Sequence, residues 1–270
     1  MFKRLTAVWL ILSLLLMLGL AGCQGGANAD NSLKAVKDKG VLVLGMDDAF
    51  PPMGFRDENN EIVGFDIDLA KEVAKRMGVT LKIVPIDWSQ KLNELNSGAI
   101  DCIWNGYTIT ETRKTETNVT SAYMKNRQVV VVLKDSPYQT LADLAGKTLA
   151  VQAESSAVEA LEKAVDFKAS LKDAVELKDN VMVMQDLDAK TSDAILLDEI
   201  VANYNIKQKG LNYRVLDESL AEEEYGVGFR KNDQALRDEV EKTLKAMAAD
   251  GTLKTISETW FGEDVTVIKG

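Results

Sequence analysis

The sequence of 270 residues contains no histidine and only two cysteines, Cys23 and Cys102. Without histidine, catalysis by a Ser-His-Asp triad or a Cys-His pair is excluded, and so is a histidine-rich metal site. Cys102 lies in an apolar run, which indicates a buried small side chain rather than a nucleophile. We therefore expect no internal disulfide, no metal and no cofactor, while carboxylate or lysine chemistry stays open.

Positive charge is also scarce, since 32 Lys and Arg face 42 Asp and Glu for a net charge of −10. Residues 1–22 carry two basic residues and no acidic one, so the remaining 248 residues have 30 basic and 42 acidic side chains, a net charge of −12. Nucleic acids and anionic lipid surfaces select for basic patches, so we expect no nucleic-acid partner. The length suffices for two lobes of ordinary domain size.

The longest hydrophobic run lies at the N-terminus. Two basic residues precede the almost entirely apolar run 5–21, which is shorter than the ~20 residues that comfortably span a bilayer. Leu20-Ala21-Gly22-Cys23 resembles a bacterial lipobox; an ordinary signal peptide with a chance cysteine is the alternative. The order predicts a signal peptide over 1–22, a lipid on Cys23, a flexible tether over 23–32 and a location on the extracytoplasmic face of the cell membrane.

Short apolar runs alternate with amphipathic segments along the rest of the chain. Apolar positions three and four apart predict helices at about 67–77, 92–95, 236–247 and 253–260. Strands that alternate with helices favour βαβ units, and we therefore expect an α/β fold with mostly parallel sheets flanked by helices. Strands are predicted at 41–44, 81–84, 100–104, 129–133, 149–151, 194–197 and 227–229.

Polar segments interrupt this alternation twice, at about 115–128 and 217–224. Two interruptions fit a chain that leaves one lobe, builds a second and returns to the first. In such a fold a ligand binds in the cleft, where strand ends and helix N-termini converge. We predict lobe 1 over 33–125 and 220–270, lobe 2 over 126–219, and two hinge crossovers between them.

Segment 104–113 (WNGYTITETR) combines three groups suited to a small carboxylate. Gly106 lets a ligand approach the backbone closely, Thr108 offers a hydroxyl, and Arg113 offers a planar fork that matches a carboxylate. A surface turn with a solvated arginine is the alternative.

Several motifs together resemble the family 3 extracellular solute-binding proteins, which are the polar amino-acid receptors of ABC importers. The resemblance extends over about 38–262 and implies a two-lobed periplasmic-binding-protein fold of type II. It also implies capture of a free amino acid for delivery to an ABC permease. In the motif 64–74 we expect Asp66 to cap the following helix. We expect no residue of 64–77 to touch ligand. The motifs are 64–74, 47–53, 106–113, 193–198 and 260–262.

The resemblance assigns both ends of a bound zwitterion, whose charges need partners once water is removed. Arg113, with the backbone near Gly106 and Thr108, matches the site of the α-carboxylate. The helix N-terminus at Ser155 and Ser156 would add amide donors. A capping box of Ser156 with Glu159 is the alternative there. Asp198 matches the acceptor for the α-amino group, and its alternative is a plain N-cap for helix 199–208.

The resemblance also points to a side-chain pocket. Phe50 and Trp88 match aromatic rings that enclose the ligand's side chain, although either could belong to the core. Asp47 matches a contact to the polar tip of that side chain, and an aspartate accepts from an amide as well as from a cation. Glu154 stands where the family commonly has glycine. It is either a solvated loop residue or a second acidic group that favours arginine, lysine or ornithine over glutamine or cystine.

Two other functions compete with the receptor hypothesis. The same fold hosts a periplasmic dehydratase, for which Glu154 or Asp47 would be the general acid or base. A sensor ectodomain would need a signalling domain or a second membrane segment, and we expect none after Gly270. Nothing else in the sequence points to catalysis, so we expect a binding protein and not an enzyme.

Overall fold

A computed structural model describes residues 30–270 of the chain. The predicted signal peptide, the predicted lipid on Cys23 and most of the predicted tether lie outside these residues. Helix α2 (Ser32–Lys39) begins at the end of the tether range. Over the described stretch, no helix has both the length and the apolar character to cross a membrane.

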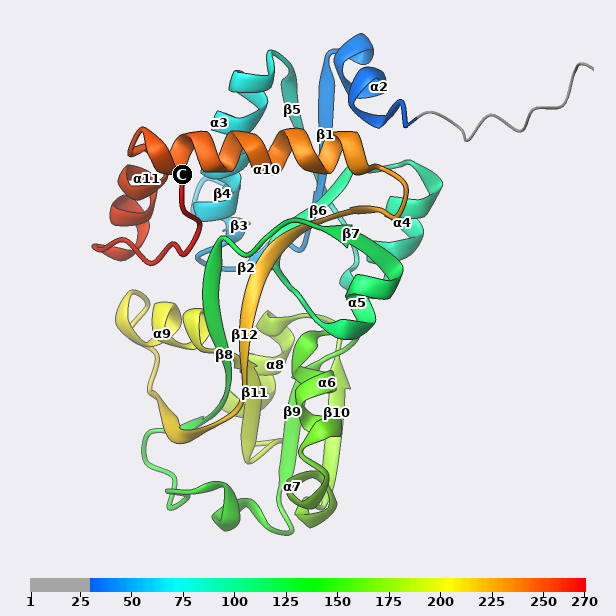
Figure 1. The fold of residues 1–270 in the computed structure, drawn as a ribbon. Helices are drawn as coiled ribbons and strands as arrows, with labels where there is room; N and C mark the ends of the chain where they lie inside the picture. Colours follow the sequence, from blue (N-terminus) through cyan, green and yellow to red (C-terminus); the bar gives the residue numbers. More distant parts are fainter. Residues whose placement is uncertain (1–29) are drawn as a thin grey trace, which may run out of the picture. The chain divides into compact units, whose positions relative to one another are not determined.

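Within residues 30–270 the main sheet has nine strands, in the order β10-β9-β11-β8-β12-β6-β1-β5 with β7 beside β12 (Figure 1). Strand β1 pairs in parallel with β5 and β6, and β9 pairs in parallel with β10 and β11. The predicted α/β fold with mostly parallel strands is confirmed. The bounds are β1 (Val41–Met46), β5 (Thr80–Pro85), β6 (Cys102–Thr108), β7 (Thr117–Val119), β8 (Met124–Leu133), β9 (Thr148–Gln152), β10 (Asp173–Leu177), β11 (Ala194–Asp198) and β12 (Tyr213–Arg230).

The long strands β8 and β12 join the two groups of parallel strands. They pair with each other in antiparallel register, β8 also pairs with β11, and β12 also pairs with β6 (Figure 1). We call the group around β1 the first lobe and the group around β9 the second lobe. The polar interruptions at 115–128 and 217–224 therefore lie largely in strands. The two segments pair with each other, so their backbone N–H and C=O groups find hydrogen-bond partners while many of their side chains stay exposed.

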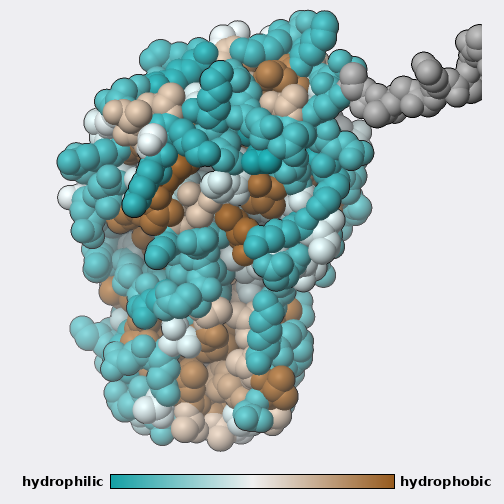
Figure 2. Space-filling model, viewed as in Figure 1, coloured by the Kyte–Doolittle hydropathy of each residue, from teal (hydrophilic) through white to brown (hydrophobic). Residues whose placement is uncertain are grey.

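Helices cover both groups of strands. In the first lobe α3 packs on β5 and contacts α10 and α11, and in the second lobe α6 and α8 pack on β9 while α9 packs on β11. Hydrophilic residues dominate the face seen in Figure 2, as the acidic composition requires. The remaining bounds are α3 (Phe65–Met77), η1 (Trp88–Gln90), α4 (Lys91–Ser97), α5 (Glu111–Glu116), η2 (Leu141–Leu144), α6 (Ser156–Lys163), α7 (Val165–Ser170), α8 (Asn180–Asp188), α9 (Glu199–Lys207), α10 (Gln234–Ala249) and α11 (Thr252–Phe261), with a small sheet of β2 (Ala49–Phe50), β3 (Gly54–Arg56) and β4 (Ile62–Val63).

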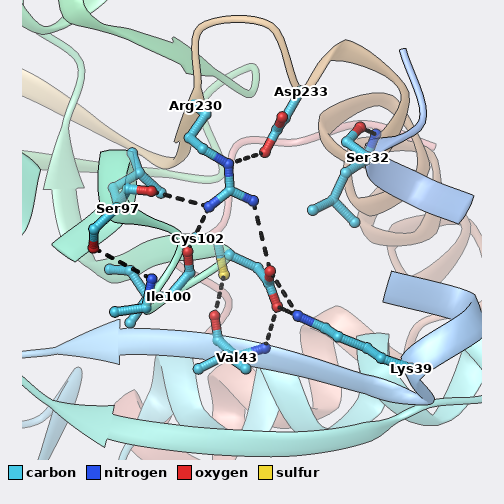
Figure 3. A network of polar contacts seen from close by, with 12 residues as sticks. Ser32, Lys39, Val43, Ser97, Ile100, Cys102, Arg230 and Asp233 are labelled. Atoms are coloured by element: carbon cyan, nitrogen blue, oxygen red, sulfur yellow. Dashed lines mark hydrogen bonds and ion pairs between the residues drawn. The ribbon is translucent and has the colours of Figure 1, made fainter. Parts of the chain in front are cut away.

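Arg230 at the end of β12 connects strands of the first lobe's sheet through a network of polar contacts (Figure 3). Its guanidinium donates to the carbonyl oxygen of Ile100 at 2.6 Å and pairs with Asp233 at 2.6 Å and with the buried Asp101 at 3.6 Å. Asp101 in turn accepts from the backbone N–H of Val43 at 2.7 Å. One cation thus links β12, β6 and β1.

We expect Arg230→Ala to lower the free energy of unfolding by about 2–4 kcal/mol, because it leaves the carbonyl oxygens of Leu95 and Ile100 without their donor. It also removes one of the two cations beside Asp101, which keeps Lys39 at 2.6 Å. Urea unfolding followed by far-UV circular dichroism measures the change. Lys254→Ala is the control, since Lys254 forms an exposed pair with Glu258 at 3.6 Å and such pairs contribute about 1 kcal/mol or less. Equal losses in the two variants would contradict the assigned role of Arg230.

Candidate functional site

A narrow cavity of about 10 Å³, with room for about one water molecule, lies where the two lobes face each other. Its wall is built at the carboxyl ends of β1, β6, β9 and β11 and at the N-terminus of α6, where open α/β sheets bind ligands. Eight of the nine predicted ligand-binding residues line it, and Thr108 contacts the lining residue Ser156. The lining residues are Asp47, Phe50, Trp88, Asn105, Gly106, Arg113, Gln152, Ser155, Ser156 and Asp198.

Contacts between the lobes enclose this cavity. The Asp47 carboxylate accepts from Gln152 Nε2 at 2.7 Å, and the hydroxyls of Thr108 and Ser156 lie 2.9 Å apart. Lys91 Nζ donates to the carbonyl oxygen of Glu154 at 2.9 Å. A ligand enters or leaves only after such contacts break.

Arg113 on α5 brings a buried cation to the cavity. The residue is 4 % exposed, and its Nη1 donates to the carbonyl oxygen of Thr108 at 3.1 Å. The guanidinium lies over the ring of Tyr107, 4.6 Å from its centroid, and 5.9 Å from that of Trp88. None of the ion pairs among residues 30–270 involves Arg113. This buried charge therefore has no carboxylate partner among the described residues.

Asp198 at the end of β11 brings a buried carboxylate to the same cavity. Its Oδ1 accepts from Asn126 Nδ2 at 2.8 Å and from the hydroxyl of Tyr225 at 2.5 Å. Burial and then the neighbouring Glu223 raise the pKa of Asp198 well above its usual range. The alternative of a plain N-cap is wrong in one respect: α9 begins after Asp198, but the Asp198 side chain makes no capping bond to it.

Asp47 directly after β1 is a second buried carboxylate, 6 % exposed. It accepts from the backbone N–H of Ala49 at 2.9 Å as well as from Gln152. Burial raises the pKa of Asp47 to about 6 against the lowering effect of these bonds. No lysine or arginine among the described residues pairs with Asp47, so its charge is held by neutral donors alone.

Two aromatic side chains line the cavity as predicted, Phe50 and Trp88, each 6 % exposed. Trp88 also packs against Tyr107 with ring centroids 6.3 Å apart, so it serves the core and the cavity together. Lys91 Nζ lies 5.3 Å from the Trp88 ring. Burial and then the Arg113 cation lower the pKa of Lys91 to about 8.

Gly106 has φ +56°, a left-handed conformation that suits glycine, and a Cβ there would lie 2.7 Å from Phe50 Cε1. Its N–H donates to Asp66 Oδ2 at 2.7 Å, and the hydroxyl of Tyr123 donates to the same oxygen at 2.9 Å. Burial raises the pKa of Asp66 to about 7. The prediction that Asp66 caps the helix is wrong, because its carboxylate turns to β6 and leaves the helix start to Gly64.

Helix α6 begins at Ser156, as the sequence predicts, and its N-terminus faces the cavity. The capping box of Ser156 with Glu159 is wrong. The Ser156 hydroxyl contacts Thr108, Glu159 accepts from Thr110 at 3.0 Å, and no side chain caps the helix. The first-turn amides thus remain open toward the cavity.

Glu154 is exposed and does not line the cavity, so the hypothesis of a second acidic group at that position is wrong. Its φ is +56°, a left-handed conformation that glycine adopts without strain. Asn105 and Gln152 line the cavity although neither was predicted. Gln152 is the last residue of β9 and Asn105 the middle residue of β6, so a position at a strand end was an available signal for Gln152 only.

A family model described as bacterial extracellular solute-binding proteins, family 3, matches residues 42–263. The chain belongs to this family. The family 3 resemblance recognised in the motifs is therefore confirmed, and with it the two-lobed fold, which is also that of the structural neighbours described next.

Relatives of this family 3 protein bind amino acids. It is 31% identical to the L-cystine-binding protein TcyJ of Escherichia coli over 250 residues, and this matched region covers 92% of each chain. A crystal structure of Tv2483 bound to L-arginine has 35% identity and a TM-score of 0.85, covering 88% of this chain and 98% of that one. An ABC uptake transporter substrate-binding protein from Streptococcus pneumoniae with bound histidine has 36% identity and a TM-score of 0.86, covering 89% of this chain and all (100%) of that one.

Proposed function

We propose that this protein is the substrate-binding lipoprotein of an amino-acid ABC transporter and that its ligand is an L-amino acid with a cationic side chain, such as arginine, lysine or ornithine. The observation that carries the proposal is the charge inside one cavity. Among residues 30–270, Arg113 is a buried cation that pairs with no carboxylate, while Asp198 and Asp47 are buried carboxylates that pair with no lysine or arginine.

A zwitterion matches the first two of these charges. Its α-carboxylate would take the guanidinium of Arg113 and the open amides of α6 at Ser155 and Ser156. Its α-ammonium group would donate to Asp198. A cationic side chain enclosed by Phe50 and Trp88 would then donate to Asp47. Glutamine would leave that buried charge without a cation, and cystine would bring a second carboxylate together with its second ammonium group.

Delivery would follow from hinge motion. We propose lobe boundaries at 33–125 with 220–270 and at 126–219, with β8 and β12 bending between them. Arg113 belongs to one lobe and Asp198 to the other, so a bound zwitterion favours the closed form by contacts that the open form lacks. A lipid on Cys23 would hold the protein beside its permease at the extracytoplasmic face of the membrane.

Binding rather than catalysis is favoured by the fate of the two candidate acid–base groups. Glu154 is exposed and outside the cavity, and Asp47 is held by Gln152 and Ala49 without a second titratable group bonded to it. A dehydratase would need a carboxyl group placed for proton transfer at a reacting atom. We therefore assign no catalytic residue.

A thermal-shift screen of the purified protein against the common amino acids, ornithine and cystine tests the proposal. A ligand at about 100 times its dissociation constant adds ~2.7 kcal/mol of stability. The largest shifts are expected from arginine, lysine or ornithine. A panel without any shift would refute an amino-acid receptor, while a largest shift from a neutral amino acid would refute only the cationic specificity.

We expect Asp47→Asn to reorder the ligands. Arginine should lose about 10–100-fold in affinity, because the amide removes the only full negative charge at the side-chain end, whereas glutamine should change by about threefold or less. Titration calorimetry measures both. Asp48→Asn is the matched control, since the neighbouring Asp48 pairs with Arg56 outside the cavity. An unchanged ranking would contradict the role of Asp47.

A further inference from the structure

Glu223 on β12 lies beside Asp198 although it does not line the cavity. One amide nitrogen, Asn126 Nδ2, donates to Asp198 Oδ1 at 2.8 Å and to Glu223 Oε1 at 2.6 Å, which places the two carboxyl groups next to each other. Gln128 Nε2 donates to the same Glu223 oxygen at 2.9 Å. The pair therefore spans the end of β11 and the strand that connects the lobes.

Every donor to this pair is neutral. Asn126, Gln128 and Tyr225 supply hydrogen bonds but no charge, and no ion pair among residues 30–270 involves Asp198 or Glu223. The cluster is also short of donors, because Gln128 Oε1 is fully buried without a partner. Two adjacent carboxylates with neutral donors cannot both stay ionised at low cost, as a shared proton in carboxylate pairs illustrates.

The charged residues around Asp198 and Glu223 do not neutralise these two carboxyl groups. On β8, Arg127 is committed to Glu199 on α9, and across the cavity the nearest cation is Arg113. The surface beside Glu223 adds more negative than positive charge. The charged and titratable groups on the elements packed around the pair are Lys125, Arg127, Glu199, Glu222, Glu224, Tyr225, Asp47 and Arg113.

We propose that Asp198 and Glu223 hold one proton between them in the ligand-free protein, and that the ligand's ammonium group displaces this proton when it binds. Glu223 is thus a positioning residue that acts through Asp198. The proton leaves to solvent, and the ammonium group supplies the missing positive charge together with up to three N–H donors. The proton-linked site rests on the proposed function, since the displacing charge belongs to the amino acid.

The sign of the pH effect follows from this exchange. The free protein holds more protons than the complex, so the association constant rises with pH and falls by up to tenfold per unit as the pH drops below the range in which the free pair titrates. Burial and the Glu223 charge, which raise the pKa of Asp198, place that range above the usual one for a carboxyl group.

Titration calorimetry with L-arginine in phosphate and in Tris at the same pH counts the protons released. We expect the wild-type protein to release about one proton per ligand near neutral pH. Glu223→Gln keeps the acceptor for Asn126 and Gln128 but removes the second charge. This variant should release less than half as much, and its affinity should begin to fall at a lower pH.

Glu224→Gln is the matched control, because the exposed Glu224 lies one residue further along β12 and should leave release unchanged. Asp47→Asn measures the contribution of the other cavity carboxylate, and thermal unfolding verifies that each variant is folded. Binding without buffer-dependent heat, or equal release by the wild type and Glu223→Gln, overturns the shared proton alone. No binding by L-arginine or any other amino acid of the panel overturns the proposed function and the shared proton together.

Discussion

Arg113→Ala is expected to abolish the binding of every amino acid that the protein recognises, with an affinity loss of at least about 100-fold. Among the described residues, the guanidinium is the only full positive charge that lines the cavity, and without it the α-carboxylate common to all amino acids would be buried without a cation. Titration calorimetry with arginine, lysine and glutamine should give the same near-complete loss.

Two further variants test whether the loss of binding is specific to the guanidinium of Arg113. Lys114→Ala removes the next residue, which is exposed and pairs with Glu111 at 2.8 Å, and should leave binding unchanged. Arg113→Lys keeps the charge but not the planar fork and should lie between the wild type and the alanine variant. Loss of one ligand but not another in Arg113→Ala would place Arg113 at the side-chain end instead.

Asp198→Asn is expected to lower affinity by about 100-fold for all amino acids, because it removes the negative charge that faces the ammonium group. The fold should tolerate the change. The asparagine Oδ1 can still accept from Asn126 and Tyr225, so the local hydrogen bonds persist while the electrostatic attraction is lost.

The control for Asp198→Asn is Asp188→Asn at the exposed end of α8, which carries the same substitution outside the cavity. It should bind like the wild type. The unfolding midpoint of each variant without ligand separates lost affinity from lost stability. Wild-type affinity in Asp198→Asn would show that another group accepts the ammonium protons.

The residues of the cavity could be predicted from the sequence because the cavity wall consists largely of strand ends and one helix start. Local sequence patterns indicate where such strand and helix ends lie. Asp47 directly follows β1, Asp198 ends β11, and Arg113 lies in the short helix after β6. Each belongs to a recognisable motif, and all three line one cavity. The edge strand β10 was missed because it carries no apolar run: Asp173 and Glu176 are exposed, and none of its five residues is fully buried.

Contacts between distant segments were beyond the sequence. Asp66 looks like a helix cap within its own segment, yet it accepts from Gly106, 40 residues further along. The capping box at Ser156 fails for the same reason, since Thr108 of the other lobe takes its hydroxyl. The hydrogen-bond partner of a side chain depends on which groups folding brings near it. Spacing along the sequence identifies only the partners that are close in the sequence.

Phe55 on β3 of the first lobe contacts Tyr204 on α9 of the second, with ring centroids 5.6 Å apart, and also packs edge-on against Trp260 at 6.1 Å. Opening the lobes therefore alters the surroundings of an indole that lies outside the ligand cavity, whereas Trp88 lines that cavity. Among the four tryptophans of the sequence, Trp88 and Trp260 thus report on ligand contact and on closure without any label. In a Trp88→Phe background, the change in emission on closure would come from Trp260, since Trp104 is fully buried in the first lobe.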